Sequence, residues 1–240
     1  MRAAHSCVLL LADTKLLKCK GWRSWNWFGH AVSAEVIESQ IDALVARNAS
    51  RPGGDGRSLF DHGYVSIGVD DGWQACERRY ISLAAFNVCA FLCAGGEGVN
   101  GSFHSADGAP LLNQTKFPDG TAGLVQYGHQ RGVKMGFYVN NCMCSERGLS
   151  AGFADKVYAS TAEFLGSQGW DEIKIDSCSQ YHNLTKWNAL IEAKGKALVT
   201  ENCHDQWNWE WFNSSNGELE CPMHFFRVSV RGLVQARIHC

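Results

Sequence analysis

The sequence predicts an α/β fold built on a parallel sheet. From residue 22 onward, short runs of β-branched or apolar residues alternate with amphipathic stretches of helical period. No internal repeat, low-complexity tract or linker divides the 240 residues. Hydrophobic residues make up 45% and charged residues 19%, which is typical of an ordered globular protein. We therefore expect one domain of strands covered by helices.

The strand and helix patterns follow one another along the chain. Strands are expected at residues 64–69, 133–139, 172–175 and 197–200, and outer helices at 31–47 and 153–165, where apolar residues recur at helical spacing. The segment 72–116 is long, rich in glycine and without clear period. A loop of this size in a compact domain is usually functional, and in a β/α barrel it would lie over the face where loops build active sites.

Charge and hydropathy exclude several classes of partner. The net charge is −2 and no basic run of five or more residues exists, so neither nucleic acid nor an anionic membrane is an expected partner. No run of about 18 apolar residues is long enough to span a membrane.

Cysteines and glycosylation motifs predict a secretory route. The chain has eleven cysteines, and the odd number leaves at least one thiol outside any intrachain disulfide. Five Asn-x-Ser/Thr triplets are potential glycan acceptors, at Asn48, Asn100, Asn113, Asn183 and Asn213. Residues 1–20 meet the pattern of a signal peptide only in part, since their apolar stretch is short. We expect a protein that is secreted or lysosomal/vacuolar.

Carboxylates follow two of the predicted strands. In Glu172-Ile-Lys-Ile-Asp176, Lys174 and Asp176 lie two apart on one face, and a neighbouring ammonium favours the ionised carboxylate that a nucleophile needs. An ordinary ion pair is the alternative. Asp70 and Asp71 end another strand and need a cation or hydroxyl donors nearby, such as those of a sugar, although Asp-Gly is also a common turn dipeptide.

Aromatic and thiol clusters each allow two interpretations. Three tryptophans within residues 22–27 suit stacking on a pyranose, but such a cluster is more often simple core. Zinc ligands could come from 142–144 (Cys-Met-Cys) or 203–204 (Cys-His), yet the Cys-x2-Cys spacing of zinc sites is absent. We therefore expect no metal and no cofactor.

Five motifs in fixed order resemble the α-galactosidases (melibiases) of glycoside hydrolase family 27. They are Gly-Trp-x-Ser-Trp-Asn at 21–26, Asp-Asp-x-Trp at 70–73, Lys-Phe-Pro-Asp-Gly at 116–120, Gly-Val-Lys-Met-Gly-Phe-Tyr at 132–138 and Lys-Ile-Asp-Ser-Cys at 174–178. The resemblance implies a (β/α)8 TIM-type barrel, here incomplete with about six β/α units. It also implies retaining hydrolysis of terminal α-galactosides, or of α-N-acetylgalactosaminides as in the sister activity.

The resemblance also assigns roles to residues at the motif positions. Asp176 matches the nucleophile. Substrate-binding positions are matched by Trp25, Asp70, Asp71, Tyr138 and Lys174, with His204 and Arg227 added from the later segments. Cys178 matches a cysteine in a disulfide, for which Cys142 and Cys144 are the candidate partners. None of these roles requires a cofactor.

The catalytic acid/base is the missing part of the pattern. A retaining glycosidase needs a second carboxyl group about 5 to 5.5 Å from the nucleophile. In the family it ends a pattern like Arg-x-Ser-Gly-Asp, whereas Val230 and Arg231 follow Ser229 here. We therefore expect an N-terminal segment (1–20), a partial catalytic barrel (21–229) and a tail without family likeness (230–240).

An unclosed barrel exposes strand edges, so we also expect poor stability or association, with a homodimer as the simplest assembly. Three functions remain open. The first is an α-galactosidase-type hydrolase, and the second is a catalytically inactive sugar-binding remnant of the barrel. The third, a cysteine-rich adhesion domain, accounts for the cysteines but not for the order of the motifs.

Overall fold

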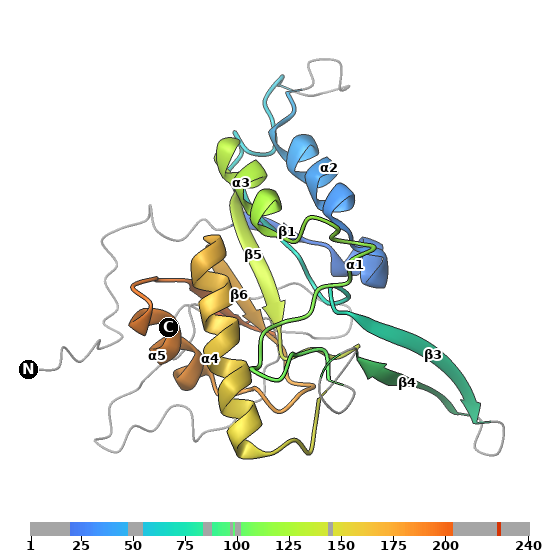
Figure 1. Cartoon of the computed structure of the whole chain (residues 1–240). Helices are drawn as coiled ribbons and strands as arrows, with labels where there is room; N and C mark the ends of the chain where they lie inside the picture. The colour runs from blue at the N-terminus through green and yellow to red at the C-terminus, as the bar shows by residue number, and fades with distance from the viewer. Residues whose placement is uncertain are drawn as a thin grey trace, which may run out of the picture.

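Six parallel strands form one open sheet in the computed structural model, which describes residues 20–47, 55–83, 88–96, 98, 102–143, 146–203 and 225–226. The strands lie in the order β1-β2-β5-β6-β7-β8 (Figure 1). Their bounds are Lys20–Arg23 (β1), Tyr64–Gly68 (β2), Lys134–Val139 (β5), Glu172–Ile175 (β6), Val199–Asn202 (β7) and Phe225–Phe226 (β8). The expected α/β fold is thus confirmed as a partial β/α barrel.

Helices follow the strands and cover one face of the sheet. They are α1 (Trp25–Phe28), η1 (Gly29–Ala31), α2 (Ala34–Val45), α3 (Ala122–Gln130), α4 (Ala151–Gln168) and α5 (Leu184–Ala193). Ser33, Ser150 and Asn183 cap the starts of α2, α4 and α5, where each side chain accepts a hydrogen bond from a backbone N–H three residues on. The left-handed Gly169 ends α4 (φ 83°).

Alternation along the strands separates an apolar face from a polar one. Ile67, Phe137 and Ile173 are fully buried in the core cluster, together with the apolar faces of the helices. Their neighbours Ser66, Gly68, Gly136, Tyr138, Glu172 and Lys174 alternate with them and so lie on the opposite face. The inner face of the curled sheet is therefore polar, and the site described below is built on it.

Two expectations about elements were wrong in detail. The last predicted strand begins two residues later, at Val199, whose N–H donates to the carbonyl of Asp171 (2.9 Å), so that pairing with β6 starts there. The segment 72–116 contains an antiparallel pair, β3 (Cys76–Leu83) and β4 (Val88–Gly96), that extends away from the sheet (Figure 1). Residues 76–83 and 88–96 lack the strict polar–apolar alternation of a half-buried strand, so periodicity did not reveal them.

Within the described part of the chain, no helix combines the length and apolar character needed to cross a membrane.

Candidate active site

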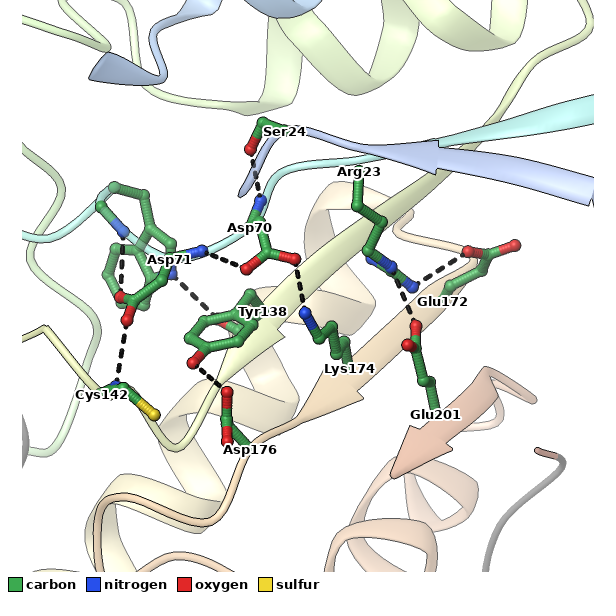
Figure 2. A network of polar contacts seen from close by, with 12 residues as sticks. Arg23, Ser24, Asp70, Asp71, Tyr138, Cys142, Glu172, Lys174, Asp176 and Glu201 are labelled. Carbon is green, nitrogen blue, oxygen red and sulfur yellow. Dashed lines mark hydrogen bonds and ion pairs between the residues drawn. The ribbon is translucent and has the colours of Figure 1, made fainter. Parts of the chain in front are cut away.

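The carboxyl ends of three strands bring the predicted site residues together. Asp70 follows β2, Tyr138 lies near the end of β5, and Lys174 and Asp176 belong to β6 and the residue after it (Figure 2). In the sheet register Tyr138 pairs with Lys174, and Gly68, two residues before Asp70, pairs with Gly136, two residues before Tyr138. The carboxyl ends of neighbouring parallel strands meet at one edge, which is where barrel enzymes place their active sites.

Lys174 and Asp70 form a buried ion pair across this edge. Lys174 Nζ donates to Asp70 Oδ2 over 2.6 Å, and the two side chains are 5% and 2% exposed. The ammonium also lies over the Tyr138 ring, 5.1 Å from its centroid. Burial acts to lower the pKa of Lys174, but the charges of Asp70, Cys203 and Glu201 together outweigh burial and raise that pKa above its ordinary value. Lys174 thus supplies the cation that was expected near the two aspartates, and it pairs with Asp70.

Asp176 accepts two hydrogen bonds that fix its carboxylate. Tyr138 donates its hydroxyl to Oδ2 (2.5 Å) and the N–H of Ser177 donates to Oδ1 (2.7 Å). Burial, followed by the charges of Asp71 and Asp176, raises the pKa of Tyr138 far above its ordinary value. The phenol is therefore protonated at neutral pH and can donate to Asp176.

Asp71 points away from this pair and holds a loop. Its Oδ2 accepts the N–H groups of Cys142 (3.0 Å) and Met143 (2.8 Å), and its Oδ1 accepts Gly72 N (2.9 Å) and Gln74 Nε2 (2.6 Å). Burial raises the pKa of Asp71, although these donors oppose the shift. With two donors on each oxygen, the carboxylate fixes the start of the loop that follows β5.

A disulfide joins that loop to the segment after Asp176. Of the two candidate partners of Cys178, the structure pairs it with Cys142. Ligand atoms of Cys142, Asp176 and Cys178 lie within 4.8 Å of one another, but the two sulfurs are bonded together and so are not free thiolates. The arrangement positions the Asp176 loop and does not form a metal centre.

Asn140 holds the backbone of the loop after Asp176, a role that the sequence analysis did not predict. It is the only non-glycine residue with positive φ (61°) in the part of the chain that the structure describes. Its side-chain amide donates to the carbonyl of Asp176, and its Oδ1 accepts the N–H of Tyr181 (2.8 Å). Asparagine tolerates this left-handed conformation better than most residues. The Asn-Asn pair directly after a predicted strand was the available signal.

Arg23 on β1 reaches across the inner face to two glutamates. Its Nε donates to Glu201 Oε2 (2.9 Å) and its Nη2 to Glu172 Oε2 (3.3 Å), while Ser66 Oγ donates to the same Glu172 oxygen (2.7 Å) (Figure 2). Burial acts to lower the pKa of Arg23, but the charges of Glu201, Glu172 and Asp70 together outweigh burial and raise that pKa. The alternation of Glu172 with Lys174 and Asp176 was a sequence signal for this polar face.

The remaining predicted residues are placed as follows. Trp25 is 40% exposed on α1, next to Ser24, whose hydroxyl accepts the N–H of Asp70 (3.0 Å). Of the other two tryptophans, Trp22 packs edge-on against Phe28, whereas Trp27 is 82% exposed, so the cluster is not simple core. His204 and Arg227 lie outside the described residues.

Comparisons with known proteins agree with this geometry. The Melibiase_2 family model, described as alpha galactosidase A, matches residues 100–216. The chain is 25% identical to an α-galactosidase of Cyamopsis tetragonoloba over 79% of its length and 38% of the relative's. It is 26% identical to α-galactosidase A of Cellvibrio japonicus, over 80% of this chain and 39% of that one. Over these ranges the chain is similar to the melibiases.

Solved structures of α-galactosidases share the fold of this chain. A Bacteroides fragilis protein superposes with a TM-score of 0.56 at 24% identity, covering 87% of this chain and 37% of its own. The α-galactosidase of Saccharomyces cerevisiae, solved with raffinose, gives 0.54 at 17% identity, covering 82% and 37%. The chain therefore spans about two fifths of the length of the proteins it matches.

Proposed function

We propose that this chain carries the galactose-binding and nucleophile half of an α-galactosidase-type glycosidase. The observation that supports it best is the convergence of Asp70, Lys174, Tyr138 and Asp176 at the carboxyl edge of three adjacent strands. An ion pair and a carboxylate side by side offer both donors and acceptors to the hydroxyls of one hexose. The substrate class is therefore a terminal α-galactoside, as an oligosaccharide or glycoconjugate.

Each residue has a distinct task in this proposal. Asp176 attacks the anomeric carbon, and the Tyr138 hydroxyl orients its carboxylate. Asp70 and Lys174 hold the ring hydroxyls, and Trp25 forms an aromatic wall beside them. Asp71 acts through the loop whose backbone it binds. We assign no residue to the acid/base role, and His204 and Arg227 remain proposed contacts of the sugar.

α-Galactosyl fluoride tests the nucleophile without an acid/base, because fluoride leaves without protonation. The Asp176 carboxylate forms a bond to the anomeric carbon as the C–F bond breaks and fluoride departs with the electron pair. Mass spectrometry of the full chain should find one galactosyl unit on the peptide that contains Asp176. Asp176→Asn should abolish labelling, whereas Asp155→Asn, at an exposed carboxylate paired with Lys186 on the helical face, should not.

Two results of this labelling experiment would contradict the proposal. An adduct on another residue would refute the role of Asp176. Galactose binding without any adduct would favour the alternative of an inactive sugar-binding barrel remnant.

We also propose that the protein passes through the secretory pathway, to the outside of the cell or to a lysosome or vacuole. The disulfide between Cys142 and Cys178 supports this route, because such bonds persist in oxidising compartments.

A further inference from the structure

Two cations cross the inner face of the sheet at different levels. Lys174 starts on β6, passes over the Tyr138 ring of β5 and reaches Asp70 beyond β2 (Figure 2). Arg23 starts on β1 and reaches Glu172 on β6 and Glu201 on β7. Each cation therefore pairs with carboxylates that lie at least two strands away from its own.

Sheet register makes this pairing unexpected for Lys174. Glu201 is its direct partner on the neighbouring strand, and Glu172 lies two residues earlier on its own strand and on the same face. Neighbouring strands are only ~4.8 Å apart, so Glu201 is the nearest carboxylate by register. Both Glu201 and Asp70 act to raise the pKa of Lys174, with Asp70 the stronger of the two. Another cation must therefore pair with Glu172 and Glu201.

Arg23 is that cation, since it pairs with both Glu172 and Glu201. The sheet also leaves space for its guanidinium. Gly68 and Gly136 pair with each other, and Arg23 pairs with Gly68, so these positions lie in one row across three strands. A Cβ at Gly136 would lie 2.7 Å from Arg23 Nη1, and a Cβ at Gly68 would overlap the same atom. Two adjacent glycines thus leave room for one long, planar cation.

We propose that Arg23 is a positioning residue that engages Glu172 and Glu201 and thereby reserves the Lys174 ammonium for Asp70. Without Arg23, two buried carboxylates lose their cation, and Lys174 turns to Glu201, its neighbour in register. Asp70 then loses its partner and the sugar-binding pair is dismantled. This inference deepens the proposed function, because it concerns what holds that pair together.

Double-mutant cycles in the full chain test the inference without any ligand. Denaturant unfolding gives the coupling of Lys174→Met with Asp70→Asn, and of Lys174→Met with Glu201→Gln. With Arg23 present, the coupling to Asp70 should be the larger one. In an Arg23→Met background the order should reverse. The same order of couplings in both backgrounds would overturn the proposal.

A matched control and a compensated variant complete the design. Arg131→Met removes an arginine that pairs with Asp42 on the helical side, and it should leave the order of couplings unchanged. If Arg23→Met alone does not fold, Arg23→Met with Glu172→Gln and Glu201→Gln removes the competing carboxylates as well. This triple variant should fold and keep the Lys174–Asp70 coupling. Its failure to fold, or loss of that coupling, would make Arg23 a structural residue only and overturn the proposal.

Binding of the iminosugar 1-deoxygalactonojirimycin separates this inference from the proposed function. If the wild-type chain does not bind it, the proposed function fails while the cycles still decide the role of Arg23. If it binds, Arg23→Met should weaken binding at least tenfold and Arg131→Met should not. Unchanged affinity in Arg23→Met would count against Arg23 as a positioning residue.

Discussion

At the scale of single residues, the site depends on groups that hold the reactive side chains rather than on those side chains alone. Asn140 illustrates this, since its amide binds the backbone on both sides of the loop that contains Asp176. It does so from a left-handed backbone conformation that costs most residues about 1 to 2 kcal/mol. Conformation and hydrogen bonding can be separated by mutation.

Asn140→Gly and Asn140→Ala should therefore differ. Both variants lose the side-chain hydrogen bonds, but only alanine also bears the backbone penalty, so Asn140→Ala should be less stable than Asn140→Gly by about 1 kcal/mol. Urea unfolding of the two variants measures the difference. Equal stabilities would mean that the loop relaxes out of the left-handed conformation.

Glu146 provides a pH-dependent contact next to the site. Its carboxylate bonds His104 Nδ1 (2.8 Å), the Ser102 hydroxyl and the N–H of Phe103 (3.1 Å), and Tyr181 lies against it. Burial acts to raise the pKa of Glu146, but the hydrogen bond and charge of His104, together with the contacts of Ser102 and Tyr181, outweigh burial and hold the pKa below the ordinary value of 4.5. The contact joins the segment before α3 to the loop after β5.

The lowered pKa of Glu146 sets the direction of the pH effect. A carboxyl group whose pKa is lower in the folded state stabilises the protein above its unfolded value, and that stability is lost as the pH falls through the folded value. Glu146→Gln should cost about 2 kcal/mol at neutral pH and progressively less below the ordinary carboxyl pKa. Urea unfolding midpoints of the wild type and of Glu146→Gln, measured from neutral pH to below the ordinary carboxyl pKa, test this prediction. A stability difference that stays constant with pH would contradict it.

At the scale of elements, β2 and β5 each carry a glycine, Gly68 and Gly136, whose missing side chain leaves room for the Arg23 guanidinium. Gly68→Ala should destabilise the chain by about 2 to 3 kcal/mol, because the new methyl group would overlap the Arg23 guanidinium. Gly123→Ala in α3 is the matched control, since a Cβ there meets no atom within 4 Å, and it should stabilise by about 0.5 kcal/mol. Thermal unfolding compares them. A neutral Gly68→Ala would show that the guanidinium has free space to move into.

The sequence predicted the strands and helices more completely than it predicted the side-chain contacts between them. Short runs of β-branched or apolar residues revealed β2, β5 and β6, and residues 172–176 also alternate between polar and apolar side chains. The same alternation placed Lys174 and Asp176 on one face but could not tell that Lys174 would pair with Asp70, 104 residues away. Arg23 was missed for the same reason: its partners come from β6 and β7, and no local pattern encodes a pairing across four strands.

At the scale of the whole molecule, the sheet formed by the described residues has two edge strands that do not pair with each other. β1 and β8 lie at opposite edges of the six-stranded order. In a closed barrel every strand has two neighbours, whereas an edge strand offers unpaired N–H and C=O groups to another chain.

The isolated chain should therefore associate in a concentration-dependent manner. Sedimentation velocity over a range of protein concentrations should detect species larger than the 26.5 kDa monomer, with a dimer as the smallest. A cooperative monomer at every concentration, stable at high temperature, would contradict this expectation.

The bond between Cys142 and Cys178 has a practical consequence for anyone who produces this protein. It closes a stretch with a sequence separation of 36 and ties the backbone that binds Asp71 to the backbone that follows Asp176. Closing a loop of this length is worth about 4 kcal/mol in the chain-entropy model. Material made in a reducing bacterial cytosol should therefore retain the sheet but hold the loop after Asp176 loosely, and an oxidising host is the better source for every measurement of sugar recognition.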